Sequence, residues 1–162
     1  MISIKRADSA NLPDIFNLAN KIWQVTYVQN IGQDQVDYML YLFYSEKALK
    51  EKLEMGHDIF TIHYNGNFSG YFHLEHRPTD IFIHKLYIDT SLQHKGLGTW
   101  TINHLKSEIS STQKELRLHV NRKNYKAINF YFKNGFTIEG YDDFDIGNGY
   151  YMNDFIMSYT KK

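Results

Sequence analysis

The chain has 162 residues, of which 43% are hydrophobic, and it carries 18 Lys and Arg against 18 Asp and Glu. This length suffices for one well-packed domain, so we expect a single domain over residues 1–162. The balanced charge argues against nucleic acid as a partner, the lack of a long apolar run argues against a membrane span, and the absence of cysteine excludes disulfides, thiolate zinc sites and a covalent cysteine intermediate.

The composition also bears on location and on metal binding. The N-terminal residues have the pattern of a strand and not the apolar stretch of a signal peptide, so we expect a cytoplasmic protein. The 8 histidines are scattered without metal-ligand spacing, which predicts no metal site. The 13 Tyr and 11 Phe predict an aromatic core, with an aromatic-walled ligand pocket or dimer face as the alternative.

The N-terminal part predicts one strand followed by helices. Residues 2–7 alternate in polarity as a strand does. Asn11 is expected to cap the first helix, with Pro13 in its first turn and Asp14 reaching back. Ser45 has the position of a second cap. The apolar spacing predicts helices over residues 11–27, 34–43 and 45–54.

The middle of the chain predicts a three-stranded meander. Residues 58–64 and 68–75 are strands joined by a tight turn at Asn65-Gly66, a dipeptide that favours hairpins. A turn over residues 77–80 leads into a third strand, residues 81–88.

The C-terminal half predicts two more helices and three more strands. Ile102, Leu105 and Ile109 recur on one face of a helix that also carries Gly98. Gly135 is placed to end the second helix in a left-handed conformation. The remaining predicted elements are a strand over residues 115–120, a helix over 124–134, and strands over 136–141 and 150–159 joined by a loop over 142–149. The order β-α-α-β-β-β-α-β-α-β-β predicts an α/β fold with one mixed, mostly antiparallel sheet flanked by helices.

The junction between strand 81–88 and the next helix carries a candidate anion site. Gly96 and Gly98 have no Cβ, so backbone N–H groups can turn toward a ligand there. The first N–H groups of a helix have no intrahelical partners and lie at the positive end of its dipole. Lys95 adds a full charge. The pattern Q-x-x-G-x-G differs from the common nucleotide fingerprints, but it predicts a phosphate or pyrophosphate site.

A second motif lies on the helix over residues 124–134. Asn124, Ala127 or Ile128, and Tyr131 fall on one helix face. An amide and a phenol hydroxyl on one stripe suggest a bound cofactor with a reactive end. A packed core aromatic is the alternative interpretation of Tyr131.

Together these motifs resemble the GCN5-related N-acetyltransferase superfamily. A narrower resemblance joins Trp23-Gln24-Val25-Thr26-Tyr27 and Tyr38-Met39-Leu40 to a small bacterial branch that contains polyamine acetyltransferases. The segments that carry the broader resemblance are Leu86-Tyr87-Ile88, Gln93-His94-Lys95-Gly96-Leu97-Gly98, Val120-Asn121-Arg122-Lys123-Asn124, Ala127, Phe130-Tyr131 and Asn134-Gly135-Phe136.

The resemblance implies acetyl-coenzyme A as the acetyl donor. It assigns the strand before the loop to the pantetheine arm and the loop amides to the pyrophosphate. It makes Tyr131 the general acid that protonates the departing thiolate. Gln93 stands where the family more often has Arg, and it keeps a side-chain donor. The cofactor-binding residues implied are Leu86, Tyr87, Ile88, Gln93, His94, Lys95, Gly96, Leu97, Gly98, Thr99 and Asn124.

The general base is less sharply indicated. His84 lies on the strand just before the pantetheine-pairing residues, where some family members carry a working histidine, and a structural role is the alternative. Glu75 and His73 on the neighbouring strand are rivals. Trp23 and Tyr27 pack the first helix in one interpretation and line the amine pocket, with Glu75, in the other. The carboxylates of residues 142–145 form a solvated loop in one interpretation and attract a cationic amine in the other.

The expected activity is direct transfer of an acetyl group to a primary amine of a small molecule, with polyamine-like acceptors favoured. Positioning of both reactants supplies much of the rate in such a reaction. One alternative is acetylation of a protein or peptide N-terminus, and another is a non-catalytic module that binds acetyl-CoA. The aromatic closing strands lead us to expect a homodimer.

Overall fold

The computed structural model describes residues 1–162 and contains one seven-stranded sheet in the order β1-β2-β3-β4-β5-β7-β6. Strands β4 and β5 pair in parallel, whereas β1–β2, β2–β3, β5–β7 and β6–β7 pair antiparallel. The predicted mixed, mostly antiparallel α/β fold is therefore confirmed. The chain divides into two compact units: the first comprises Met1–Glu75 and Lys85–Gly98, and the second comprises His76–His84 and Thr99–Lys162.

The first unit contains three strands and four helices before its second segment. Apolar faces of the helices form much of its core: Leu12 and Ile15 of the first long helix, Val36 of the next, and Leu49 are at most 1% exposed. These elements are β1 (Ile2–Arg6), a 3-10 turn (Ser9–Asn11), α1 (Leu12–Thr26), α2 (Val28–Ile31), α3 (Gln33–Tyr44), α4 (Glu46–Glu54), β2 (Asp58–Tyr64) and β3 (Asn67–His76).

The start of α1 differs from the sequence prediction. Asn11 precedes α1, but its side chain makes no capping hydrogen bond to that helix. Its Oδ1 instead accepts from the backbone N–H of Asp8, while Asp8 Oδ1 accepts from Ala10 N, so the two side chains cap the 3-10 turn. Asn11 is the N-cap residue of α1, as predicted, but the side-chain cap is missing because the backbone N–H of Asp8 engages its amide oxygen. Ser45 does cap α4, accepting from Ala48 N at 3.2 Å.

The β2–β3 hairpin turns at Asn65 and Gly66, whose φ values of 51° and 84° are both positive. This is the conformation that an Asn-Gly hairpin favours, so the predicted turn is confirmed. Further along β3 the chain approaches β4 closely: a Cβ built on Gly70 would lie 2.4 Å from the backbone oxygen of Tyr87. Only glycine fits this position without moving the neighbouring strand.

In the second unit, the helix that carries Ile102, Leu105 and Ile109 buries the face that the apolar periodicity predicts. Ile102, Leu105 and Ile109 are at most 1% exposed, as are Leu116 and Met157. Strand β4 belongs to both units: it begins in the second unit and continues from Lys85 in the first. After β3 the chain continues with β4 (Asp80–Ile88), a 3-10 turn (Thr90–Leu92), α5 (Leu97–Ile109), β5 (Glu115–Asn121), α6 (Tyr125–Lys133), β6 (Thr137–Gly147) and β7 (Tyr150–Tyr159). The 3-10 turn and the start of α5, up to Gly98, belong to the first unit.

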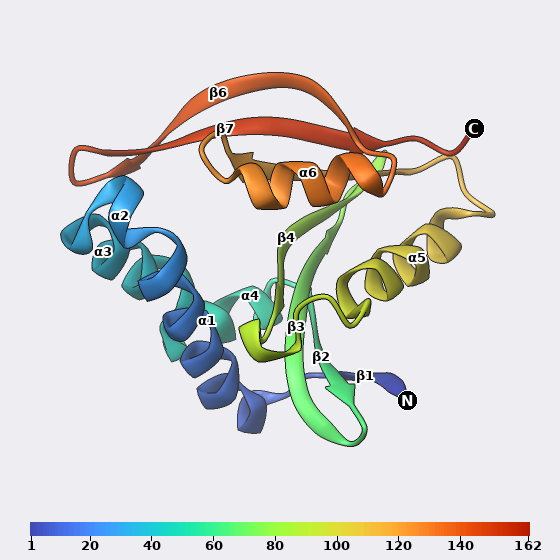
Figure 1. The fold of residues 1–162 in the computed structure, drawn as a ribbon, viewed down its shortest axis with the longest axis horizontal. Helices are drawn as coiled ribbons and strands as arrows, with labels where there is room; N and C mark the ends of the chain where they lie inside the picture. Colours follow the sequence, from blue (N-terminus) through green and yellow to red (C-terminus); the bar gives the residue numbers. More distant parts are fainter. The chain divides into compact units, whose positions relative to one another are not determined.

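The predicted loop over residues 142–149 is wrong for most of its length. Strand β6 continues to Gly147 and pairs with β7, as in Phe144↔Met152 (Figure 1). The reversal is confined to Asn148 and Gly149, with φ values of 53° and 75°. The tight turn allows the ladder to continue through acidic residues that the sequence pattern assigns to a loop.

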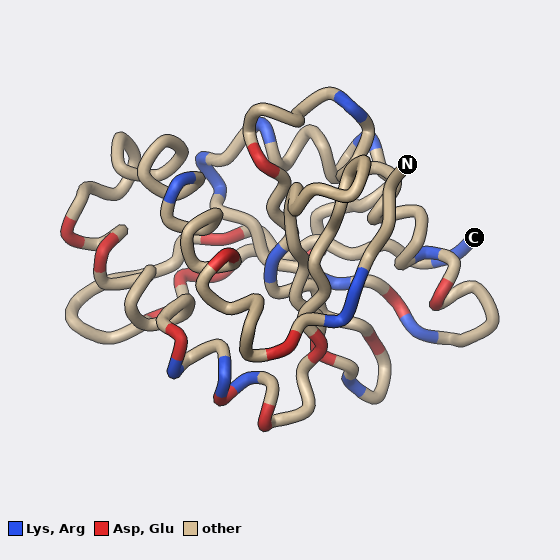
Figure 2. Tube along the Cα trace, turned by 90° about the horizontal axis from the view of Figure 1, so that it is seen from below, with Lys and Arg blue, Asp and Glu red and all other residues tan.

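Charge is interspersed along the chain, as Figure 2 shows for Lys and Arg against Asp and Glu. The pattern agrees with equal totals of both signs. None of the helices combines the length and the apolar character that crossing a membrane requires.

Candidate active site

The loop between β4 and α5 has the backbone geometry of an anion site. His94 and Gly96 both have positive φ, 67° and 80°, while Lys95 between them does not. When consecutive residues alternate between left-handed and right-handed backbone conformations, their N–H groups point toward one place. They form a concave anion-binding site, called a nest. A Cβ built on Gly96 meets nothing within 4 Å, so the space in front of this backbone is open. The sequence indicates that a glycine is needed at this turn, in agreement with the positive φ of Gly96, but it does not indicate the left-handed conformation of His94.

The start of this loop is firmly anchored within the first unit. Asp89 N donates to Ser69 O at 2.8 Å, and Asp89 Oδ1 accepts from both the backbone N and the hydroxyl of Ser91. Lys21 forms an ion pair with the same carboxylate. The pKa of Asp89 is lowered, chiefly by the Ser91 hydroxyl hydrogen bond. These contacts hold the loop in register with the end of β4.

The second half of β4 contains the predicted pantetheine-pairing residues. The β4–β5 register runs from Asp80↔Glu115 to Ile83↔Leu118, and β4 continues to Ile88. Leu86, Tyr87 and Ile88 are half-buried.

The Tyr87 side chain belongs to a buried aromatic cluster. Trp23 Nε1 donates to Tyr87 Oη at 3.1 Å, and Tyr44 Oη donates to the same oxygen at 3.1 Å. The rings of Trp23 and Tyr27 lie 4.5 Å apart, and Trp23 is only 6% exposed. Burial raises the pKa of Tyr87, and the charge of a Tyr44 phenolate would raise it further. The packing interpretation of Trp23 is confirmed, whereas contact of Trp23 or Tyr27 with a substrate stays a prediction.

Lys85 places an amino group inside this aromatic cluster. Its Nζ lies 3.7 Å from the centre of the Tyr44 ring and donates to the backbone oxygen of Phe43 at 3.1 Å. Burial lowers the pKa of Lys85 from 10.5 to about 7, with a smaller contribution from Lys52. Sequence reasoning missed this residue because its partners come from α3, far away along the chain.

The lowered pKa of Lys85 predicts a pH-dependent stability. Between about pH 7 and pH 10.5 the unfolded chain binds a proton that the folded chain does not, so the free energy of unfolding should rise with pH across this window. The slope should reach about 1.4 kcal/mol per pH unit. In Lys85→Met, the rise of the unfolding free energy with pH should be mostly lost, as measured by urea unfolding at pH 7, 8 and 9. Lys50→Met, at an exposed position of α4, should leave the slope unchanged. An equal slope in Lys85→Met would contradict this origin.

Two histidines of the first unit form a buried pair. His57 Nδ1 lies 2.8 Å from His73 Nε2, and the side chains are 6% and 1% exposed. The interpretation of the histidines as merely scattered is therefore wrong for these two, since strand β3 brings together residues that lie 16 positions apart. Glu75, the other rival base, lies half-buried on the same strand.

In the second unit, Tyr131 lies on α6 and Asn124 directly precedes this helix as its N-cap, and both have structural contacts. Asn124 Oδ1 accepts from Ala127 N at 3.2 Å and caps the helix. Tyr131 is 9% exposed, with its ring 5.1 Å from that of Phe130 and 5.4 Å from that of Phe136. The cap and the aromatic contacts fix both side chains, as a positioned catalytic pair requires. A role in chemistry stays a prediction.

His84 is the predicted base on β4. Its ring meets the Phe82 ring edge-on at 4.7 Å, and the side chain is half-buried. On the other side of Phe82, the His119 ring lies 4.9 Å away.

A cavity of about 440 Å³ opens in the second unit, and none of the predicted site residues lines it. Arg117 is bound to Glu139, and Arg77 lies 4.1 Å over the Phe82 ring. The pKa of His119 is lowered by burial first and then by the two arginines. The lining residues are Arg77, Phe82, Arg117, His119, Glu139, Gly140 and Ile156.

Comparison with known proteins places these motifs in a family. The family model described as "Acetyltransferase (GNAT) family" matches residues 12–136. A spermidine N(1)-acetyltransferase from Thermoplasma acidophilum is 25% identical over 152 residues, covering 89% of this chain and 93% of that protein.

Two solved structures show the same fold. The PaiA N-acetyltransferase of Thermoplasma acidophilum, in complex with coenzyme A, matches with a TM-score of 0.81 and 21% identity over 99% of both chains. The ribosomal-protein-S18-alanine N-acetyltransferase of Escherichia coli matches with a TM-score of 0.72 and 18% identity, covering 99% of this chain and 94% of that one. Since the family model spans most of the sequence, this chain belongs to the GNAT family of acetyltransferases.

Proposed function

We propose that this chain transfers an acetyl group from acetyl-CoA to a primary amine of a small linear polyamine. The observation that carries the proposal is the open backbone nest at His94 to Gly96, directly before α5. A nest at a helix N-terminus suits a pyrophosphate, which the donor contains.

The segment Lys85–Gly98 of the first unit has two roles in this proposal. The loop amides from Gln93 to Gly98 would hold the pyrophosphate, where Lys95 would add a charge and Thr99, which belongs to the second unit, a hydroxyl. The backbone of Leu86–Ile88 pairs with the pantetheine arm. In support, the β4–β5 register ends at Ile83↔Leu118, while β4 extends to Ile88.

The second unit supplies the proton donor. Bound acetyl-CoA supplies an activated acetyl thioester, and the remaining chemistry falls to side chains of this chain. The Asn124 amide would contact the pantetheine, and the Tyr131 hydroxyl would give its proton to the departing thiolate. A phenol with a pKa of about 10 can share a proton with a thiol of pKa roughly 8.5 when the two are hydrogen-bonded.

The acceptor ammonium must lose a proton before it attacks. We assign this step to His84, directly or through a water. His73 suits the role less well because it is 1% exposed and bonded to His57. Glu75 remains the carboxylate rival.

The polyamine acceptor is supported by the relative that carries the name spermidine N(1)-acetyltransferase. The fold is equally compatible with a peptide N-terminus as acceptor, as the likeness to a ribosomal-protein-alanine acetyltransferase illustrates. A homodimer accompanies the proposal as an expectation.

Thiol release from acetyl-CoA tests the proposal directly. The purified chain is incubated with spermidine, with butylamine and with an alanine-first peptide, each at equal concentration. Release with spermidine above the other two supports the proposal. Release with the peptide alone reassigns the acceptor, and binding of acetyl-CoA without release for any acceptor supports a non-catalytic module.

Replacement of Gly96 should remove most of the affinity for acetyl-CoA. In Gly96→Val a branched side chain would fill the nest and disfavour φ of 80°, so we expect a Kd at least about tenfold higher by calorimetry. Gly66→Val is the matched control, because Gly66 has φ of 84° and open space at the β2–β3 turn. The two variants should lose similar stability, and Gly66→Val should bind normally. Normal affinity in folded Gly96→Val would refute the loop assignment.

A further inference from the structure

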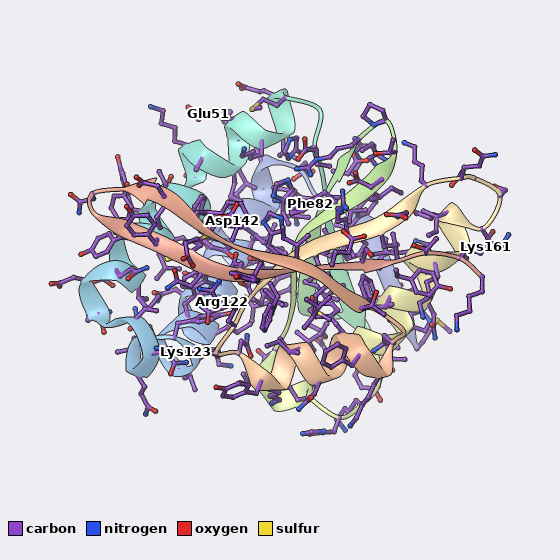
Figure 3. All side chains as sticks on the ribbon, turned by 90° about the horizontal axis from the view of Figure 1, so that it is seen from above. Glu51, Phe82, Arg122, Lys123, Asp142 and Lys161 are labelled. Atoms are coloured by element: carbon purple, nitrogen blue, oxygen red, sulfur yellow. The ribbon has the colours of Figure 1, made fainter.

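Two carboxylates face each other across the β6–β7 ladder of the second unit. Asp142 of β6 pairs directly with Asp154 of β7 (Figure 3, where Asp142 is labelled). Directly opposed residues of an antiparallel pair point to the same side of the sheet, with Cβ atoms about 5 Å apart. Like charges so placed destabilise a sheet, so the pair calls for a counter-charge.

Asp154 is the unusual member of the pair. It is 7% exposed and makes no side-chain hydrogen bond within the protein, whereas Asp142 Oδ1 accepts from the backbone N–H of Asp143 at 2.8 Å. Buried carboxylates are normally hydrogen-bonded or paired, because leaving one unsatisfied costs free energy. Burial raises the pKa of Asp154 to about 6, against the opposing effect of Arg122.

The guanidinium that acts on Asp154, that of Arg122, forms its ion pair with another carboxylate. Arg122 Nη2 bonds to the Asp143 carboxylate, and Nη1 donates to the backbone oxygen of Asp142 at 3.5 Å. Figure 3 labels Asp142, which lies on β6, and Arg122, which lies in the turn directly after β5. Among Asp142, Asp143 and Asp154, the guanidinium thus pairs only with the carboxylate of Asp143, which leaves the other two carboxylates without an ion pair.

The pair is connected to the predicted cofactor helix through short steps. Asp154 pairs with Asn121 at the end of β5. The Asn121 carbonyl accepts from the backbone N–H of Asn124, the residue that caps α6. The carboxylates therefore lie close to the end of α6 at which Asn124 stands.

We infer that Asp142 and Asp154 bind one ammonium group of the acceptor and so select amines with two or more amino groups over monoamines. The inference rests on the proposed function. A primary ammonium is small, carries three donors and can bridge two facing carboxylates. The second amino group of the same molecule is then the one available for acetylation.

Calorimetry in the presence of coenzyme A tests the inference, with spermidine and butylamine as probes. Asp154→Asn and Asp142→Asn should each weaken spermidine binding at least tenfold and leave butylamine binding unchanged. Asp145→Asn is the control, since Asp145 also lies exposed on β6 and its Oδ1 accepts from Gly147 N. Asn at position 154 removes a buried charge, so the melting temperature should not fall.

The outcomes separate the two proposals. Unchanged spermidine affinity in Asp154→Asn, or equal losses for spermidine and butylamine, would overturn the carboxylate site. Binding of coenzyme A without any binding of spermidine to the unmodified chain would also overturn it, while leaving acetyl transfer to another acceptor open. Spermidine binding that depends on Asp154 without thiol release would support the site and refute the proposed function.

Discussion

Tyr131→Phe should lower kcat by on the order of 10²- to 10⁴-fold, the range that loss of one general acid typically gives. Phenylalanine keeps the ring and its contacts with Phe130 and Phe136, at 5.1 and 5.4 Å. Because only the hydroxyl is removed, the melting temperature and the affinity for acetyl-CoA should stay nearly unchanged. Single-turnover thiol release measures the chemical step apart from product release.

Tyr125→Phe is the matched control for this experiment. Tyr125 lies on the same helix but is 70% exposed, so loss of its hydroxyl should leave kcat unchanged. If Tyr131→Phe retains the unmodified single-turnover rate, the hydroxyl is not the acid, and the residue is a packed aromatic that completes the α6 core.

Gly70→Ala should reduce the free energy of unfolding by roughly 3 kcal/mol, at the upper end of the usual cost of overpacking. The new Cβ would lie 2.4 Å from Tyr87 O and 3.2 Å from Ile88 Cα, and both are backbone atoms that cannot rotate away. Strand β4 must therefore shift at the residues assigned to the pantetheine arm. We expect urea unfolding to show the loss of stability and calorimetry to show weaker acetyl-CoA binding in the folded fraction.

Gly140→Ala provides the comparison. Gly140 also lies in a strand, but a Cβ there meets nothing within 4 Å. This substitution should be neutral or slightly stabilising, because alanine reduces the freedom of the unfolded chain. Equal stability of the Gly70 and Gly140 variants would show that β3 and β4 separate easily at Gly70.

The sequence predicts the elements whose signals are local. Ile102, Leu105 and Ile109 recur at helical spacing and are all buried on α5. The Asn65-Gly66 turn follows from the backbone preferences of two residues. The extension of β6 past Asp142 is missed because its residues are exposed and polar, and only pairing with β7 makes them a strand.

The same distinction holds for the candidate site. The loop at Gly96 is found because strand, glycines and helix follow one another in the chain. The contact of Lys85 Nζ with the Tyr44 ring depends on the packing of α3 against β4. The facing carboxylates of Asp142 and Asp154 depend on the pairing of β6 with β7. Their contacts are not readable from spacing, and neither are the pKa changes of Lys85 and Asp154 that burial produces.

The position of β6 at the end of the strand order has a consequence for how copies of the chain behave when concentrated. An edge strand offers unpaired backbone groups that can template the addition of a strand from another molecule. Here the edge carries Asp142, Asp143 and Asp145, and its register is interrupted near Ile138 and near Asp145. A second copy laid against it in an antiparallel arrangement would bring these carboxylates toward their own counterparts. The acidic, irregular rim thus resists the strand-by-strand growth that leads to fibrous aggregates.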